Sequence, residues 1–348
     1  MLPLSDFDYV LPKELIAQTP IEPRDSSRLL VLENGKIQHR LFSDFPSYLQ
    51  PGDVLVLNDT KVSALKLEGK KATGGGVELL VLSRTGTFAT CLISGKNIRE
   101  GTELIFGGGK LTAVVLDKRD DGKYHVEFAS GSEDASSAEG REPFEKMLSS
   151  LSTTPLPPYI REKLDRSERY QTVYASPPGS AAAPTAGLHF TGQMLEKIGS
   201  VGVNIVYVTL HIGTGTFLHV TEEALKRGKL ESEFFKIGKP AAETINNAIQ
   251  GGGRLFVVGT STMRALESSV KNGVVMPQSS STELFIYPGY KFKLPVHALL
   301  TNFHLPRSTL IMLVCAYVGR ERVFDAYKAA IEMKYRFYSF GDAMLIVP

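Results

Sequence analysis

The residue pattern between positions 62 and 155 differs from the pattern on both sides of it, and this difference constrains the fold most strongly. Short β-type runs recur there, and glycine-rich turns such as Gly74–Gly76 and Gly107–Gly109 separate several of them. Six short strands at this spacing are typical of a small all-β barrel or sandwich. The predicted strands span 65–67, 77–82, 88–92, 102–106, 111–116 and 124–128.

The flanking regions predict helices that alternate with strands. The predicted strand 53–57 is continuously apolar after Asp53, as in a sheet that is covered on both faces, and the later alternation suits a mixed or mostly parallel sheet. We therefore predict a mixed α/β fold, with a large discontinuous domain (1–61 and 156–348) and an inserted β-barrel domain (62–155) that ends in a Ser/Glu-rich linker. Predicted helices cover 193–200, 222–227, 240–250 and 264–271, and predicted strands cover 203–210, 254–258, 283–287 and 298–301.

The composition is that of an ordinary globular protein. Hydrophobic residues make up 43% of the 348 residues and charged residues 22%, with a formal net charge of +2. This mildly basic balance permits a nucleic-acid partner without arguing for one, because dedicated nucleic-acid-binding domains are usually strongly basic. Cys91 and Cys315 both lie in apolar runs. Two buried free thiols of a cytosolic protein are the expected interpretation, rather than a disulfide framework or a thiolate metal site.

No segment of the chain has the pattern of a targeting or membrane-spanning sequence. The N-terminus lacks a basic stretch followed by an apolar one, so no secretory signal is predicted. The apolar run 308–319 is bounded by Arg307 and Arg320, and it falls short of the ~20 residues that a span requires. We expect a cytoplasmic protein with no membrane partner. The absence of coiled-coil repeats favours a monomer.

Three of the seven histidines lie in short loops beside strand-like runs. His189, His211 and His304 each stand among Gly, Thr, Asn or Pro and near an aromatic residue. Loops that are anchored on rigid elements often carry catalytic groups, and histidine moves protons most readily near neutral pH. We predict that these loops form an active site. The alternatives are core histidines that orient their loops, and a zinc triad, although no HExxH or CxxC spacing supports the latter.

Together with six other short blocks, these loops resemble the S-adenosylmethionine:tRNA ribosyltransferase-isomerase family of queuosine biosynthesis. Each block alone is a weak signal, but all nine occur in the family's order from one end of the chain to the other. The family pairs a large α/β domain with a small inserted β-barrel, in agreement with the residue pattern. The blocks are Asp6–Tyr9, Leu57–Thr60, Arg169–Tyr174, Pro184–Phe190, His211–Phe217, Gly259–Arg264, Tyr287–Tyr290, Thr301–Pro306 and Tyr335–Met344.

The resemblance implies a specific reaction. The ribosyl part of S-adenosylmethionine is transferred to the aminomethyl group of a 7-deazaguanine base at the wobble position of tRNA, which gives epoxyqueuosine and releases adenine and methionine. Loss of a proton next to the sulfonium requires a general base with a pKa near the working pH. Adenine expulsion requires an acid or a hydrogen-bond donor. S-adenosylmethionine is then a co-substrate and tRNA the partner, and neither a metal nor a bound cofactor is expected.

Two acidic residues complete the candidate catalytic set. Asp59 follows a buried strand, where open α/β sheets gather ligand-binding groups. It can hydrogen-bond the ribose or adenine, or it can simply close a turn. Asp342 leaves the same two alternatives open. The candidate catalytic residues are His189, His211, His304, Asp59 and Asp342.

The turn 259–262 joins a predicted strand to a predicted helix and is a candidate anion site. Amide groups at a helix N-terminus attract carboxylate or phosphate, and Arg264 can add a bidentate contact. The alternative is an ordinary helix cap, with Arg264 paired to Glu267. The candidate substrate-binding residues are Asn58, Thr60, Thr185, Gly187, Gly213, Thr214, Gly215, Thr260, Ser261, Arg264 and Asn302.

Two basic and aromatic stretches are candidates for RNA contact, through Arg169 and Tyr170 and through Tyr335 and Arg336. Stacking together with phosphate contact is how proteins hold a splayed-out base of an RNA loop. A solvated helix face explains the first stretch nearly as well. One position departs from the family pattern, because Glu231 stands where a histidine is usual. If that histidine carries essential chemistry in the family, this protein lacks it; the alternatives are that the histidine is secondary or that Glu231 accepts the same partner.

Two other classes of function remain open from the residues. A His-rich metal-dependent hydrolase predicts stoichiometric zinc or manganese and inactivation by a chelator. A non-enzymatic RNA-binding protein predicts steeply salt-dependent binding of many RNAs without turnover.

Overall fold

The computed structural model describes residues 3–130, 138–217 and 222–348. The chain forms two compact units, one made of Met1–Lys61, Pro157–Pro177 and Ala182–Pro348, and the other of Val62–Leu156 and Pro178–Ala181. The short return of the chain to the second unit carries strand β12 (Pro178–Ser180), and the backbone N–H of Ser63 donates to the carbonyl of Ser180 over 3.0 Å.

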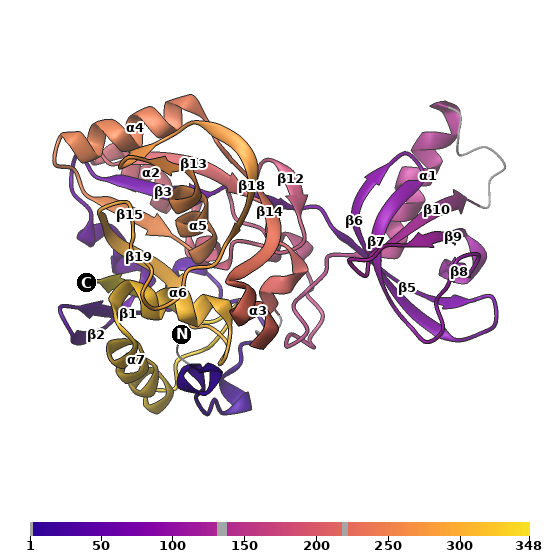
Figure 1. The fold of residues 1–348 in the computed structure, drawn as a ribbon, viewed down its shortest axis with the longest axis horizontal. Helices are drawn as coiled ribbons and strands as arrows, with labels where there is room; N and C mark the ends of the chain where they lie inside the picture. The colour runs from indigo at the N-terminus through magenta and orange to yellow at the C-terminus, as the bar shows by residue number, and fades with distance from the viewer. Residues whose placement is uncertain (1–2, 131–137, 218–221) are drawn as a thin grey trace. The chain divides into compact units, whose positions relative to one another are not determined.

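A nine-stranded mixed sheet is the centre of the first unit (Figure 1). Its strand order is β18-β14-β13-β3-β15-β19-β20-β1-β2. The neighbours from β13 to β19 run parallel, whereas β14, β18 and β2 pair antiparallel at the two edges. The strands are β1 (Arg28–Glu33), β2 (Lys36–Leu41), β3 (Val54–Asn58), β13 (Asn204–Leu210), β14 (Lys229–Ile237), β15 (Leu255–Val258), β18 (Gln278–Leu284), β19 (Val296–Asn302) and β20 (Ala343–Val347).

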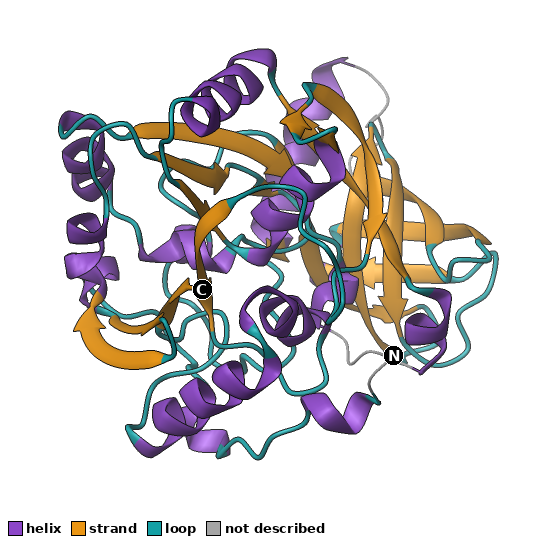
Figure 2. Cartoon of the chain, turned by 60° about the vertical axis from the view of Figure 1, so that its left-hand side comes forward, coloured by secondary structure: helices purple, strands orange, loops and turns teal. Residues whose placement is uncertain are grey.

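Helices cover both faces of this sheet, as Figure 2 shows. Successive side chains of a strand point to opposite faces, so Val54 and Val56 of β3 enter one core cluster while Leu55 and Leu57 enter another. This explains why β3 is apolar at consecutive positions. The helices are α2 (Gly192–Ser200), α3 (Glu222–Arg227), α4 (Lys239–Gln250), α5 (Thr260–Ser269), α6 (Thr309–Val318) and α7 (Arg320–Glu332).

Short elements connect these parts. The 3-10 helices are η1 (Leu4–Phe7), η2 (Lys13–Leu15), η3 (Arg24–Ser26), η4 (Phe42–Tyr48), η5 (Gly107–Gly109), η6 (Ser167–Tyr170), η7 (Thr185–His189) and η8 (Thr214–Phe217). The two-residue strands are β4 (Lys61–Val62), β11 (Ser152–Thr153), β16 (Val270–Lys271) and β17 (Val274–Val275).

The second unit is a closed antiparallel barrel. Its strand order is β5-β6-β7-β10-β9-β8, and pairing of β5 with β8 closes it. Alternate side chains such as Leu67, Leu79 and Val126 fill its interior. The predicted combination of a mixed α/β fold with a small β-barrel is confirmed. The strands are β5 (Leu65–Lys71), β6 (Gly76–Thr85), β7 (Phe88–Ser94), β8 (Glu103–Phe106), β9 (Leu111–Lys118) and β10 (Tyr124–Ser130).

The predicted linker at the end of the barrel region is corrected by the structure. Residues 138–151 form helix α1, in which Phe144 and Leu148 are almost fully buried in the barrel core. These side chains are one helical turn apart and therefore share a face. The side chain of Arg84 donates to Glu145 and lies over the ring of Phe144. The helix thus belongs to the packed barrel, and the remaining linker residues 131–137 lie outside the described residues.

Most predicted elements of the α/β unit occur within a few residues of their predicted bounds. The predicted strand 283–287 is wrong, because β18 lies earlier, at Gln278–Leu284. The helix expected at 264–271 begins at Thr260, and the elements β14, α7 and β20 were not predicted. The apolar run near position 310 forms helix α6. Among the described residues no helix has the length and apolar character that crossing a membrane requires.

Candidate functional site

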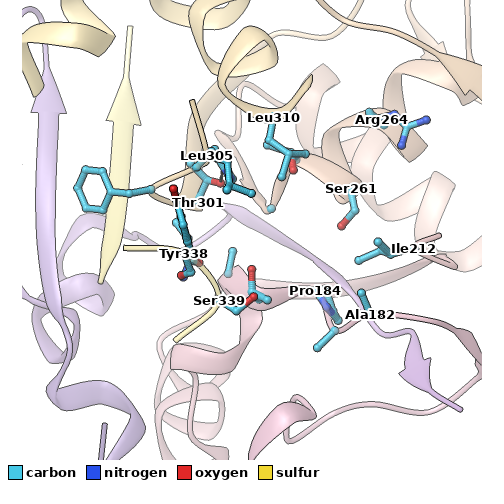
Figure 3. A pocket seen from close by; sticks show the side chains of 18 of the residues that line it. Ala182, Pro184, Ile212, Ser261, Arg264, Thr301, Leu305, Leu310, Tyr338 and Ser339 are labelled. Atoms are coloured by element: carbon cyan, nitrogen blue, oxygen red, sulfur yellow. Dashed lines mark hydrogen bonds between the residues drawn. The ribbon is translucent and has the colours of Figure 1, made fainter. Parts of the chain in front are cut away.

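A pocket lies where central strands of the nine-stranded sheet end (Figure 3). The loops after β13 and β19 bring Ile212 and His304 to its wall, and the first turn of α5, which follows β15, brings Ser261. Thr301 and Tyr338 face Ser261 and Ile212 across it. The carboxyl ends of parallel strands are the usual ligand-binding edge of an open α/β sheet. The pocket is therefore the natural place for a substrate of this fold.

His304 lines this pocket as a neutral hydrogen-bonding group. Its Nε2 lies 2.8 Å from the hydroxyl of Thr301, and its backbone N–H donates to the hydroxyl of Tyr327. Only 8% of the residue is exposed, and burial lowers its pKa to about 3. A ring with this pKa stays uncharged at neutral pH and is a weak base. His304 thus lies on the pocket wall, but its lowered pKa makes it unsuited to act as a strong general base.

His189 lies outside the pocket lining and is sealed in the core. Its Nδ1 is 2.7 Å from the hydroxyl of Ser27, and its ring stacks on Phe42 at 4.9 Å. Burial lowers its pKa to about 4, which Asn302 opposes. This geometry fits a core histidine that is held through Nδ1 alone, because its Nε2 is buried without a hydrogen-bond partner among the described residues. It corrects the placement of His189 among the catalytic residues.

His211 differs from both because its ring is only half-buried. Its Nδ1 lies 2.7 Å from the hydroxyl of Thr60, and the ring stacks on Phe234 with centroids 5.3 Å apart. Partial burial lowers its pKa, and the charge of Asp59 opposes that shift. His211 itself does not line the pocket, although its chain neighbours Leu210 and Ile212 do. Of the three histidines, His211 best meets the requirements for proton transfer near neutral pH.

The acidic partner of this histidine lies at the end of β3. A carboxylate oxygen of Asp59 accepts a hydrogen bond of 2.7 Å from Thr209, and burial raises the pKa of Asp59. Thr60, the residue after Asp59, contacts His211, and Thr209 lies two residues before His211, so these residues form one polar cluster at the sheet edge. We call Asp59, Thr60, Thr209 and His211 the His211 cluster.

Asn58 ties three segments together rather than facing a ligand. Its amide nitrogen donates to the carbonyl of Leu210 and to Ser261, each over 3.0 Å. Its carbonyl oxygen accepts from the backbone N–H groups of Leu210 and Thr60. These bonds occupy its donors and acceptor. The structure therefore corrects Asn58 from a substrate ligand to a residue that fixes the ends of β3 and β13 against α5.

Glu233 is a site residue that the sequence interpretation missed. One of its carboxylate oxygens accepts from the backbone N–H of Gly213 over 2.7 Å, and the other accepts from Arg264. Both side chains of this ion pair are 8% exposed. The sequence held one signal for this role. Glu233 is an acidic residue in phase with Phe235 and Ile237, whose alternate positions on the 229–237 strand are buried. Glu233 joins the loop after His211 to helix α5.

The partner of Glu267 excludes one alternative considered above. Glu267 accepts hydrogen bonds from the hydroxyl of Tyr290 and the backbone N–H groups of Lys293 and Leu294. Arg264 instead pairs with Glu233 and donates to the carbonyl of Leu284. The alternative in which Arg264 pairs with Glu267 is therefore wrong.

The N-terminus of α5 reaches the pocket with unused donors. Thr260 and Ser261 line the pocket, and no side chain caps the helix at Gly259, whose φ is +90°. The first N–H groups of a helix have no partners within the helix and attract anions. Arg264 also lines the pocket, and its Nη2 is buried without a hydrogen-bond partner among the described residues. These groups are suited to a carboxylate or phosphate.

The other predicted substrate ligands divide into two groups. Thr185 and Asn302 line the pocket, where the amide of Asn302 donates to the carbonyl of Tyr338 over 2.9 Å. Gly187 does not line it, and a Cβ there would lie 2.0 Å from the hydroxyl oxygen of Tyr174, so packing explains this glycine.

The loop 213–215 also lies outside the pocket lining. It contains the predicted ligands Gly213, Thr214 and Gly215. A Cβ at Gly215 would lie 3.0 Å from a carboxylate oxygen of Glu231. Glu231, which stands where the family usually has a histidine, therefore borders this loop.

Asp342 belongs to a structural junction rather than to the pocket. It is 1% exposed and accepts from the backbone N–H groups of Arg28 and Arg336 and from the Arg28 side chain. Arg28 lies 4.0 Å above the ring of Tyr335, and Arg336 donates to the carbonyl of Thr19. This placement corrects the prediction that Asp342 is catalytic. It also corrects the prediction that Tyr335 and Arg336 contact RNA, because both side chains are occupied within the junction.

Arg169 and Tyr170 are also placed in the interior. Arg169 is 8% exposed, donates to the carbonyl of Ile21 and pairs with Glu22 at 3.0 Å. Tyr170 is fully buried with its ring edge against Phe340. A base cannot stack on a buried ring, so the expectation that this stretch contacts RNA is corrected.

No group of three or more His, Cys, Asp or Glu residues suited to a metal ion occurs in the described part of the chain.

Comparison with known proteins identifies the family. The model of the queuosine biosynthesis protein family matches residues 4–346. The chain belongs to this family. It is 50% identical to the S-adenosylmethionine:tRNA ribosyltransferase-isomerase of Acetivibrio thermocellus and 49% identical to that of Symbiobacterium thermophilum, each over 99% of both chains. A crystal structure of S-adenosylmethionine tRNA ribosyltransferase from Thermotoga maritima is 36% identical, with a TM-score of 0.54, and the match covers 98% of this chain and 100% of that one.

Family membership decides among the functional classes considered from the sequence. The recognised resemblance is confirmed, because curated relatives of about half identity span nearly the whole chain. These relatives are enzymes by name, and none of the compared proteins described here is a metal-dependent hydrolase or a non-enzymatic RNA-binding protein. The two alternative classes therefore have no support.

Proposed function

We propose that this protein transfers and isomerises the ribosyl moiety of S-adenosylmethionine onto 7-aminomethyl-7-deazaguanine at the wobble position of tRNA. The products are epoxyqueuosine in tRNA, adenine and methionine. The observation that carries the proposal is near-full-length similarity to S-adenosylmethionine:tRNA ribosyltransferase-isomerases. The pocket at the carboxyl edge of the sheet has groups for anion binding, and His211 follows Leu210 of its wall, so that the two together supply chemistry suited to this reaction.

His211 is the proposed general base. When its Nδ1–H donates to Thr60, Nε2 carries a free lone pair. That nitrogen takes the proton as the C–H bond next to the sulfonium breaks, and the bonding electron pair stays on carbon beside the positive sulfur. Partial burial keeps the pKa of His211 below its ordinary value, so the neutral ring predominates at pH 7.

His304 and α5 have complementary proposed roles. Neutral His304, held by Thr301, hydrogen-bonds a polar atom of the substrate without adding charge to the pocket. The uncapped N-terminus of α5 and the unused Nη2 of Arg264 receive the methionine carboxylate. Thr185 and Asn302 on the pocket wall contribute further polar contacts.

We propose that S-adenosylmethionine is a co-substrate and that no metal or resident cofactor takes part. The sulfonium charge itself stabilises the carbanion that forms next to it, so the reaction requires no further electron sink. Metal analysis of active protein and an assay with chelator test this point. Full activity in chelator is expected, and loss of activity that added metal restores would contradict it.

A cytoplasmic monomer is the proposed state. The free cysteines Cys91 and Cys315 are both buried, as is common in proteins of reducing compartments. Light scattering after size exclusion is expected to give the mass of one chain at micromolar concentration. Fractionation of cells that express a tagged chain checks the compartment.

One assay tests the proposed reaction directly. Purified protein is mixed with S-adenosylmethionine and a transcript that carries 7-aminomethyl-7-deazaguanine at the wobble position, and free adenine and digested nucleosides are quantified. Adenine and epoxyqueuosine are expected in equal amounts, and neither is expected with an unmodified transcript. Folded protein that gives no adenine and no new nucleoside would overturn the proposal.

A further inference from the structure

An exposed aromatic surface runs along β13 and β14, on the face opposite to the side chains of Val206, Val208 and Leu210. Tyr207 and Phe234 are each 40% exposed, although both rings lie on strands of the central sheet. The register places Thr209 opposite Lys236, and the backbone N–H of His211 donates to the carbonyl of Phe234. We call Tyr207, His211, Phe234 and Lys236 the aromatic face.

The strand period explains how these side chains come together. Residues 206, 208 and 210 of β13 are buried in the main core cluster, so the alternate positions 207, 209 and 211 point to the opposite face. On β14, Phe235 and Ile237 point inward, and Phe234 and Lys236 therefore point outward. Two aromatic positions and a cation thus follow one another along a pair of strands.

The rings of this surface are already arranged for stacking. Phe234 lies nearly parallel to His211, with an interplanar angle of 24° and centroids 5.3 Å apart. Tyr207 contacts Tyr174, which is held beneath it at 5.5 Å. A planar group placed on the open side of Phe234 would extend a stack that ends at His211 and Thr60. The aromatic face is therefore continuous with the His211 cluster.

We propose that the aromatic face binds single-stranded nucleotides of the tRNA loop that carries the modified base. Stacking on aromatic side chains accepts any base because every base has a π-face, and a neighbouring cation contacts the phosphates. Lys236 is exposed and supplies that charge between the two aromatic positions. The inference rests on the proposed function, because it assigns the RNA contact that the buried Arg169, Tyr170 and Tyr335 do not provide.

Binding of the substrate tRNA by single variants tests this assignment. Phe234→Ala and Tyr207→Ala are each expected to weaken binding by about 5- to 100-fold, the usual range for loss of one base–aromatic stack. Phe234→Tyr keeps the ring and should bind within about 2-fold of wild type, whereas Phe234→Leu keeps apolar area but loses the stack. Lys236→Ala should reduce the salt dependence by about one phosphate contact.

The matched control is Met333→Ala, which removes an exposed apolar side chain at the end of α7. It should leave tRNA binding unchanged. S-adenosylmethionine binding, measured by calorimetry, should be unaltered in Phe234→Ala and Tyr207→Ala, which also reports that both variants are folded.

The possible outcomes separate this inference from the proposed function. If wild type forms epoxyqueuosine while Phe234→Ala and Tyr207→Ala bind tRNA as wild type does, the aromatic face is not the RNA surface and the activity stands. If these variants instead change self-association measured by light scattering, the face is an interface between copies of the chain, and the inference fails. If wild type binds tRNA through this face but makes no product, the proposed reaction fails alone.

Discussion

The His211 cluster and the sealed histidines occupy the same end of one sheet, yet they are suited to different tasks. His304 and His189 are less than 10% exposed, and burial lowers their pKa values to about 3 and about 4. His211 is half-buried, and its pKa is lowered against the opposing charge of Asp59. Similar loop sequences therefore produce different proton chemistry, because burial rather than local sequence sets the cost of charging the ring.

The largest expected effect comes from removing His211. His211→Ala should lower kcat by about 10²- to 10⁴-fold, the usual contribution of a positioned acid or base, while the folded structure persists because the ring is half-exposed. Adenine release in single-turnover reactions measures the effect. The acid limb of the wild-type pH–rate profile should lie below pH ~6.5, because the pKa of His211 is lowered from its ordinary value.

The control for this variant is a histidine of similar exposure in the barrel. The Nδ1 of His125 lies 2.9 Å from a carboxylate oxygen of Asp117, and its side chain is 39% exposed. A substitution at this exposed position should be tolerated by the fold. His125→Ala should retain wild-type kcat. If His211→Ala kept its activity within about 3-fold of wild type, His211 would not be the general base, because general-base catalysis contributes at least about 10²-fold.

Removing Glu233 tests what holds the His211 loop in place. Glu233→Ala leaves Arg264 buried without its partner and takes the acceptor from the N–H of Gly213. Breaking a buried ion pair in this way costs about 3–5 kcal/mol, and chemical denaturation measures it. Glu233→Gln keeps one acceptor for Gly213 and should lose less stability. Equal stability of wild type and Glu233→Ala would mean that the loop does not depend on this connection.

The buried His304 and His189 should make the free energy of unfolding fall more steeply in acid than His211 does. A histidine whose folded pKa is about 3 binds no proton in the folded state at pH 5, whereas the unfolded chain does, so stability falls as the pH drops below about 6.5. Each such group contributes a slope on the order of 1.4 kcal/mol per pH unit between about pH 6 and pH 4. The free energy of unfolding in His304→Gln should therefore depend less on pH than that of wild type.

His211→Gln is the companion variant for this measurement. Because the pKa of His211 is lowered less strongly by its partial burial, its substitution should change the slope less than His304→Gln does. The reverse order would show that the exposure of the two rings does not control their titration.

Much of the fold followed from the sequence because its signals are local. The glycine-separated β runs predict the barrel, and the apolar run of β3 predicts a sheet covered on both faces. The amphipathic patch that forms helix α1 was assigned to a linker because Ser and Glu are frequent in linkers, and only the packing of Phe144 and Leu148 in the barrel reveals its role. Strand β18 was misplaced because its Gln-Ser-Ser-Ser-Thr sequence lacks β-type residues, and pairing with β14 holds it.

The site was predictable in position but not in the role of each residue. Loop histidines and the strand-end Asn58–Thr60 segment pointed to the carboxyl edge of the sheet, where a pocket lies. The sequence does not report burial, so His189, Asp342 and Tyr170 were assigned to functions that their enclosed positions do not permit. Glu233 was missed because its importance comes from two partners, Gly213 and Arg264, that lie 20 and 31 residues away in the chain.

The smallest expected effect concerns the hydroxyl that orients His211. Thr60→Val removes the hydrogen bond of 2.7 Å to Nδ1 while keeping the shape of a fully buried side chain. A net hydrogen bond of about 1 kcal/mol corresponds to roughly 5-fold in kcat, with little change in the affinity for S-adenosylmethionine. Thr60→Ser restores the hydroxyl and should recover most of the rate. Burial, rather than the Thr301 hydroxyl 2.8 Å from its Nε2, keeps His304 uncharged. Thr301→Val should therefore leave the pH–rate profile in place, whereas Thr60→Val should shift its acid limb. A shift in both variants would mean that the two histidines titrate as one coupled group.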